Sequence, residues 1–152
     1  MRVGILDLLS LPAHTWSESA YNLMLTKQYA SITPQAVAVW CRRRGHAVFY
    51  GAYWGNGDPR QLLPRDLDLV FIASYTQASA LAYALAKLYR RDGARTVIGG
   101  PHARAFPQDC LRFFDLVVGD CDEALVGDIL DGVDDPARPG PVFCFRRLAR
   151  PM

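Results

Sequence analysis

Three short apolar runs constrain this chain most, because each has the length of a buried strand and is too short for a buried helix. They read DLVFIAS, RTVIGG and DLVVGD, at residues 68–74, 95–100 and 115–120. A segment with apolar residues at helical spacing, residues 78–93, separates the first run from the second. Apolar strands that alternate with helices are typical of a parallel sheet covered by helices on both faces.

The N-terminal part of the chain adds two strands and a helix to this pattern. Residues 2–9 and 47–53 have the apolar character of strands. Between them, Thr33 as N-cap and Pro34 as the first helical residue predict the start of a helix. Gly45 predicts its end as a left-handed C-terminal cap. A second, weaker helical pattern covers residues 18–30.

The C-terminal part is expected to complete the domain. A short helix is predicted over residues 107–113. Asp120 and Glu123 have the spacing of a capping box, which predicts a further helix after the fifth strand. Five strands within residues 1–132 predict a flavodoxin-like (Rossmann-like), doubly wound α/β domain with helices on both faces of the sheet. Residues 133–152 read as a turn-rich tail or linker with one strand-like piece at 142–146.

Composition and cysteine usage exclude several classes of protein. The formal net charge of +2 is too small to indicate nucleic acid or a membrane surface as partner. No apolar run is long enough to span a membrane. The cysteines, Cys41, Cys110, Cys121 and Cys144, are widely spaced and form no CxxC pair, which predicts free thiols in a cytoplasmic protein.

In a doubly wound sheet the ligand lies at the carboxyl ends of the strands, beside the point where the strand order reverses. Four loops are expected there: residues 9–18, 74–78, 99–106 and 119–123. They lack the acidic cluster of a receiver domain, and a flavodoxin phosphate loop is a poor fit because residues 10–19 contain no glycine. A GxGxxG fingerprint is absent as well.

The three histidines leave alternatives open. His46 precedes the second strand, at the amino end of the sheet, and is expected to be a surface or packing residue. His14 either contacts a ligand or is an exposed loop residue. His102 either contacts a ligand or has a structural role in its turn. In the same way, Tyr75 to Gln77 are either binding residues or helix-capping residues.

Four segments together resemble a known family. They are ITPQAVAVWCRRRGHAV, DLVFIASYTQAS, TVIGGPHARAFP and FDLVVGDCDEAL. Their order and spacing over residues 2–131 resemble the N-terminal cobalamin (vitamin B12)-binding domain of cobalamin-dependent radical SAM enzymes. The resemblance implies that the corrin lies across the carboxyl ends of the strands and that its nucleotide tail enters a groove beside the sheet.

The resemblance also implies a set of cofactor-binding residues. Ser74, Tyr75 and Thr76 would face the corrin, and residues 99–102 would line the groove of the tail. Gly119 and Asp120 would form the opposite lip. The complete set expected from the loops and the resemblance is Leu9, Ser10, Ser74, Tyr75, Thr76, Gln77, Gly99, Gly100, Pro101, His102, Gly119 and Asp120.

Two departures from related proteins qualify what is expected. The DxHxxG motif of methionine-synthase-type domains is absent, since Asp7 lies seven residues before His14 and no glycine follows in register. We therefore expect base-off cobalamin, with no protein histidine on the cobalt and no metal ligand from the chain. The CxxxCxxC motif of a radical SAM domain is also absent. An iron–sulfur cluster and SAM would therefore belong to a missing, covalently linked catalytic domain.

The sequence thus predicts a binding domain that is not catalytic alone, within an enzyme of methyl transfer or radical rearrangement. Cobalamin and the linked radical SAM domain are its expected partners, without nucleic acid or membrane. Two alternatives stay open. One is a ligand-free interaction or regulatory module with the same fold, and the other is a flavodoxin-like flavin carrier.

Overall fold

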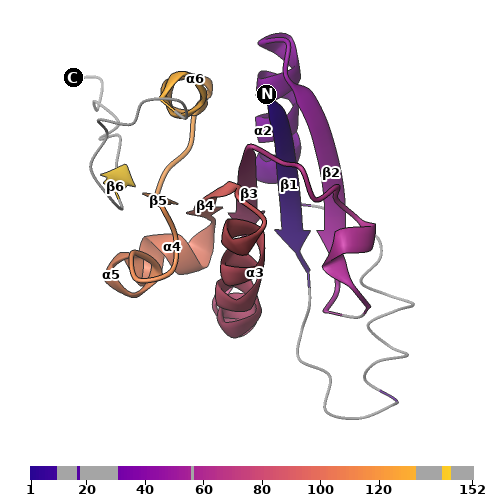
Figure 1. Ribbon diagram of the computed structural model, residues 1–152. Coiled ribbons are helices and arrows are strands. Elements are labelled where there is room, and N and C mark those ends of the chain that lie inside the picture. The colour runs from indigo at the N-terminus through magenta and orange to yellow at the C-terminus, as the bar shows by residue number, and fades with distance from the viewer. Residues whose placement is uncertain (10–16, 18–30, 56, 133–141, 145–152) are drawn as a thin grey trace, which may run out of the picture.

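The chain folds into a parallel sheet covered by helices, as the computed structural model in Figure 1 shows; it describes residues 1–9, 17, 31–55, 57–132 and 142–144. The strand order is β2-β1-β3-β4-β5-β6, and every neighbouring pair is parallel. The strands are β1 (Arg2–Leu8), β2 (Ala47–Tyr53), β3 (Leu69–Ala73), β4 (Arg95–Gly99), β5 (Leu116–Val118) and β6 (Val142–Cys144). The order of the first five confirms the predicted flavodoxin-like fold, with the switch point between β1 and β3.

Helices connect the strands on both sides of the sheet. The α-helices are α2 (Ile32–Arg43), α3 (Ser79–Arg91), α4 (Pro101–Ala105), α5 (Pro107–Cys110) and α6 (Glu123–Asp131). Two 3₁₀ turns, η2 (Pro59–Gln61) and η3 (Thr76–Ala78), precede β3 and α3. In Figure 1, α3 lies in front of the sheet and α2 lies behind it.

The sheet separates two hydrophobic cores. Side chains alternate between the faces along each strand, so Val70 and Ile72 belong to the core under α3, α4 and α5. Leu69 and Phe71 belong to the opposite core, under α2 and α6. Burial on both faces explains why the central strands are continuously apolar in the sequence.

Two helices begin at other residues than the sequence predicts. Ser31, not Thr33, is the N-cap of α2. Asp122, not Asp120, caps α6, and its carboxylate accepts a hydrogen bond from the backbone N–H of Leu125. Both corrections move the helix start by two residues. The Ser31 side chain makes no capping hydrogen bond to α2 and donates to Asp7 instead. Gly45 has φ +82°, which confirms the left-handed cap predicted after α2.

Helix α4 begins directly after β4, where the sequence suggests only a loop. Residues 142–144 form a strand, as the strand-like piece at 142–146 of the tail predicts, and this strand joins the sheet beside β5 as a sixth strand. The weak helix predicted over residues 18–30 lies outside the described residues.

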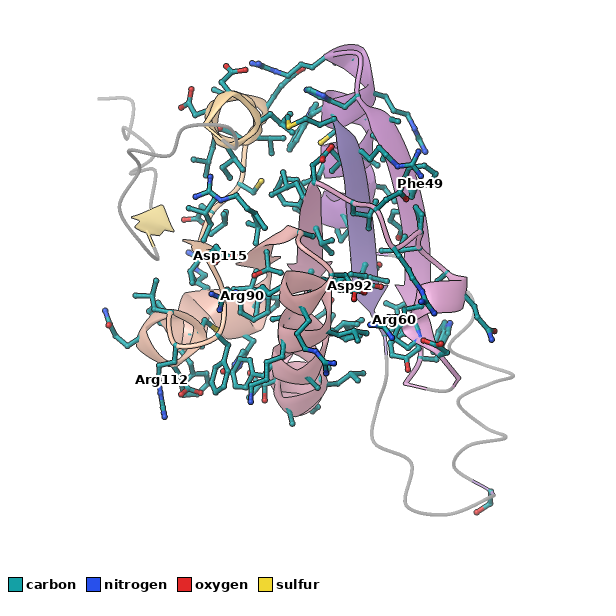
Figure 2. The ribbon with its side chains drawn as sticks, in the orientation of Figure 1. Phe49, Arg60, Arg90, Asp92, Arg112 and Asp115 are labelled. Carbon is teal, nitrogen blue, oxygen red and sulfur yellow. The ribbon has the colours of Figure 1, made fainter. Side chains whose placement is uncertain are left out.

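Ion pairs fasten the connections on the α3 side. Figure 2 shows Arg60 beside Asp92, and their Nη2 and Oδ1 atoms are 2.8 Å apart. This pair joins η2 to the residue that ends α3. Arg90 and Asp115 lie close together in the same view, with Nη2 and Oδ1 3.4 Å apart. The pairs hold α3 to the loops at the amino ends of β3 and β5.

The structure bears on two expectations from composition, the state of the cysteines and the presence of membrane-spanning helices. Cys41, Cys110 and Cys121 are free thiols, as predicted, and the first two are buried. Among the described residues no helix combines the length and the apolar character that crossing a membrane requires.

Candidate functional site

A cavity of about 660 Å³ lies at the carboxyl edge of the sheet, on the face covered by α2 and α6. Three of the four loops predicted to carry ligands meet there: those after β3, β4 and β5. The start of α2 forms a further wall. The cavity is lined by Ile5, Ser31, Ile32, Thr33, Pro34, Val37, Phe71, Ile72, Ala73, Ser74, Tyr75, Val97, Gly99, Gly100, Pro101, Arg104, Val118, Gly119, Asp120, Cys121 and Asp122.

The floor of the cavity is apolar. Ile5, Phe71 and Val97 come from the adjacent strands β1, β3 and β4 and point toward the α2 side. They stand in register across the sheet, because Ile5 pairs with Phe71 and Phe71 pairs with Val97. This surface suits a flat apolar group better than a strongly hydrated one.

The rim above β3 and β4 is made by backbone. The Ser74 N–H donates to the Gly99 carbonyl, and the His102 N–H donates to the Ser74 carbonyl, both at 3.1 Å. Gly100 has φ +98°, and a Cβ atom placed on it would lie 3.0 Å from the Ser74 oxygen. Only glycine satisfies both the backbone angle and this close approach.

A buried carboxylate holds the wall formed by the start of α2. Asp7, at the end of β1, is 1% exposed. It accepts hydrogen bonds from the Ser31 N–H at 2.8 Å, the Ser31 hydroxyl at 3.0 Å and the Tyr50 hydroxyl at 3.2 Å. Burial, helped by the charge of Asp7, raises the pKa of Tyr50 to about 12, so Tyr50 stays a neutral donor. These bonds position the first turn of α2 at the cavity.

The opposite wall carries charge and a thiol. Asp120 Oδ1 lies 3.2 Å from Arg104 Nη1, across the ends of β4 and β5. Burial, followed by the nearby charge of Asp122, raises the pKa of Cys121 to about 11. The thiol is therefore protonated at neutral pH and is a poor nucleophile.

Seven of the twelve predicted site residues line the cavity. They are Ser74, Tyr75, Gly99, Gly100, Pro101, Gly119 and Asp120. Thr76 and Gln77 are exposed in η3 and do not line it. Leu9 does not line it either, and its backbone N–H donates to the Tyr53 carbonyl. Ser10 lies outside the described residues.

His102 does not line the cavity and belongs to the other face of the sheet. Its side chain is 4% exposed. Its Nε2 atom lies 2.7 Å from the Tyr83 hydroxyl, which donates to Asp109 Oδ2 at 2.8 Å. The expected groove-lining role is corrected for a geometric reason: one helical turn separates Pro101 from Arg104, and both line the cavity, whereas the His102 ring turns away to Tyr83 of α3.

The start of α2, Arg104 and the strand residues of the floor line the cavity but are not among the site residues predicted from the sequence. A signal existed for the first and third. A helix that follows a strand in such a fold starts at the carboxyl edge of the sheet, beside the other loops. The first residues of the helix after the first strand, Ser31 to Pro34, were therefore candidates. Side chains alternate along a strand, so Phe71 of β3 and Val97 of β4, which precede Ile72 and Ile98, are expected on the same face of the sheet as each other. Arg104 had no such signal because α4 was not predicted.

The other histidines and the acidic residues give no metal site within the described part of the chain. His46 Nδ1 lies 3.5 Å from the N-terminal nitrogen, at the amino end of the sheet, as expected. His14 lies outside the described residues. No three His, Cys, Asp or Glu side chains in the described ranges group together as ligands for a metal ion.

Comparisons with known protein families, with curated proteins and with solved structures find no match to this chain.

Proposed function

We propose that this chain is a cobalamin-binding domain, with the nucleotide tail of the cofactor in the cavity and the corrin over the carboxyl ends of β3, β4 and β5. The observation that carries the proposal is the position and character of the cavity. It is apolar at its floor, bordered by glycine at its rim, and located at the edge where doubly wound sheets bind ligands.

The residues present fit the tail of such a cofactor. The tail ends in a flat aromatic base attached to a ribose phosphate, and the floor of Ile5, Phe71 and Val97 offers a matching apolar surface. The volume of about 660 Å³ lies within the range of small-molecule sites. Gly99, Gly100 and Gly119 leave the rim without side chains, so that a bulky ligand can approach the backbone.

The rim supplies groups for the corrin. Tyr75 is 47% exposed although it is a large aromatic residue, and it stands at the end of β3 beside Ser74. Its ring and hydroxyl are available to a flat macrocycle with amide side chains. The same segment resembles the corrin-facing segment of the cobalamin-binding family.

In this proposal the cofactor supplies methyl transfer or radical chemistry, and the chain binds and orients it. His102 is buried against Tyr83 on the other side of the sheet, which supports a structural role for this residue in the proposal and no contact with the cobalt. Base-off binding without a histidine ligand from the chain, and a radical SAM domain that acts on the bound cofactor, complete the proposal.

Filling the cavity tests the proposal. A side chain at Gly99 would share the face of Val97, toward the cavity, and the nearest heavy atom to a Cβ there is the Val118 oxygen at 4.0 Å. Gly99→Phe is therefore expected to fill the groove without straining the backbone. It should lower the affinity for hydroxocobalamin at least about tenfold, by the visible absorbance of the bound corrin.

Ala84→Phe is the matched control, because Ala84 is exposed on α3, on the other side of the sheet. It should bind hydroxocobalamin like the wild-type chain. Equal affinity of Gly99→Phe and Ala84→Phe would place the ligand elsewhere. Absence of binding by the wild-type chain would favour the ligand-free module, and retention of a yellow flavin would favour the flavin carrier.

A further inference from the structure

The cavity wall carries few charged side chains among the described residues, and they are one arginine and two aspartates. Among the described lining residues, Arg104, Asp120 and Asp122 carry formal charge. Asp122 uses one carboxylate oxygen as the N-cap of α6, at 2.8 Å from the Leu125 nitrogen. Arg104 is the one cation among these lining residues, and its guanidinium lies 3.2 Å from Asp120.

The Arg104–Asp120 pair joins the two sides of the cavity mouth. Arg104 projects from α4, after β4, and Asp120 follows β5. Their side chains are 66% and 37% exposed, so water screens the attraction between them. An exposed pair of this kind contributes little to stability and exchanges partners easily. The Arg104 guanidinium can therefore leave Asp120 for an anion that enters the cavity and binds it more strongly.

Helix α4 is held from the other side, which limits what can move. His102 and Ala103 are buried in the core under α3. The His102 ring is joined to Tyr83, and the Arg104 N–H donates to the Gly100 carbonyl at 3.2 Å. The backbone of Arg104 is thus fixed at the rim, and only its long side chain is free to swing.

A phosphate diester is the anion that suits this arrangement. Arginine can bind a phosphate with two parallel N–H groups, and its contact with Asp120 runs from Nη1 to Oδ1 at 3.2 Å. The carboxylate of Asp120 also repels a phosphate that lies near Arg104. The pair must therefore open when an anionic ligand enters.

We propose that Arg104 is the residue that selects the phosphate of the ligand's nucleotide tail, and that Asp120 holds Arg104 across the mouth until that phosphate replaces it. The proposal rests on cobalamin binding by this cavity. It adds a specificity residue, Arg104, and a gate, the Arg104–Asp120 ion pair, which opens when the phosphate replaces the Asp120 carboxylate. Removing the gate strengthens binding of the phosphate-containing ligand, and removing Arg104 weakens it.

The test compares two corrins in the whole chain and four proteins. Hydroxocobalamin carries the nucleotide tail with its phosphate diester, and diaquacobinamide has the corrin without the nucleotide and phosphate. Dissociation constants are measured by visible absorbance for wild type, Arg104→Gln, Asp120→Asn and the double variant. Each protein is measured at low and at high salt.

Arg104→Gln is expected to weaken hydroxocobalamin binding about tenfold, the effect of one charge-assisted phosphate contact, and to leave cobinamide within about twofold. Asp120→Asn is expected to tighten hydroxocobalamin severalfold. The double variant should match Arg104→Gln, because without the arginine the gate has nothing to release. High salt should weaken wild type more than Arg104→Gln.

Three results would overturn the inference while leaving cobalamin binding intact. They are unchanged hydroxocobalamin affinity in Arg104→Gln, an equal loss for both corrins, and weaker binding in Asp120→Asn. A wild-type chain that binds neither corrin would instead overturn the proposed function, and this inference with it. Circular dichroism of each variant separates a lost contact from a lost fold.

Discussion

At the scale of single residues, Gly100 sets the shape of the cavity rim. Its φ of +98° lies in the region that glycine adopts readily, and a Cβ atom there would lie 3.2 Å from the Ser74 nitrogen as well as 3.0 Å from its oxygen. We predict that Gly100→Ala lowers the free energy of unfolding by about 1–3 kcal/mol, because it adds backbone strain and a close contact. Urea denaturation followed by circular dichroism measures the change.

The neighbouring glycine gives the control for this prediction. Gly99 lies in β4, and the nearest heavy atom to a Cβ placed there is 4.0 Å away. Gly99→Ala should therefore change the stability by less than about 1 kcal/mol, since a strand tolerates alanine. Equal effects of the two substitutions would contradict the role of Gly100.

His102 adds a pH-dependent contribution at the same scale. Burial lowers the pKa of His102 below its ordinary value of 6.5, and nearby Asp109 acts in the opposite direction. The unfolded chain therefore binds more protons at this side chain than the folded protein. We predict that the free energy of unfolding falls as pH decreases through about 6.5, and that the fall stops below the lowered pKa.

The variant His102→Asn should reduce this fall between about pH 7.5 and pH 5.5, in urea titrations at each pH. His46→Asn is the control. The pKa of His46 is also lowered, by burial first and then by the N-terminal charge, but its side chain is only half-buried. Its replacement should flatten the pH dependence less. An unchanged slope in His102→Asn would count against the buried, neutral histidine.

At the scale of elements, the anchor of α2 on β1 controls the wall opposite Asp120. Asp7→Asn keeps the size of the side chain but replaces one acceptor oxygen by a donor that faces the donors of Ser31 and Tyr50. We predict a loss of about 1–3 kcal/mol in the free energy of unfolding. Urea denaturation measures it, and faster hydrogen exchange in the first turn of α2 locates it.

Tyr50→Phe is the graded control for this anchor. It removes one of the three donors to Asp7 and leaves the two from Ser31 in place. A smaller loss of about 0.5–1.5 kcal/mol is expected. A larger effect for Tyr50→Phe than for Asp7→Asn would show that Asp7 is not the centre of the network.

The elements themselves show what a sequence can reveal. The apolar runs predicted β3, β4 and β5 closely, because strands buried on both faces have few compatible sequences. The starts of α2 and α6 were each placed two residues away from the observed cap. Ser31 is held at the start of α2 by its hydrogen bonds to Asp7, which lies 24 residues earlier in the chain. A local sequence pattern cannot show a contact over that distance.

At the scale of the whole molecule, the topology places the site. The alternation of strands and helices predicted the doubly wound sheet, and the sheet predicted the edge where the loops after β3, β4 and β5 meet. Ser74, Gly100 and Asp120, which the family resemblance implies as site residues, lie in these loops and line the cavity. His102 was misplaced because the face on which a side chain emerges from α4 depends on a helix that the sequence pattern did not reveal.

The fold also explains why the cavity lies on one face of the sheet and not on the other. The α3 side of the sheet is filled in part by Tyr83, whose ring packs against Phe113 and Phe114. The α2 side has Gly99 at the corresponding edge and leaves space above Phe71. The cavity therefore lies on the α2 side, which is where the proposed ligand tail would enter.

The most direct test of the account is the binding of hydroxocobalamin by the purified wild-type chain, measured by visible absorbance after desalting. Retained corrin absorbance with a saturable stoichiometry near one is the expected result, with weaker binding in Gly99→Phe and unchanged binding in Ala84→Phe. A wild-type chain that retains no corrin up to about 100 µM, a dissociation constant equivalent to about −5.5 kcal/mol, would contradict the proposed cobalamin binding.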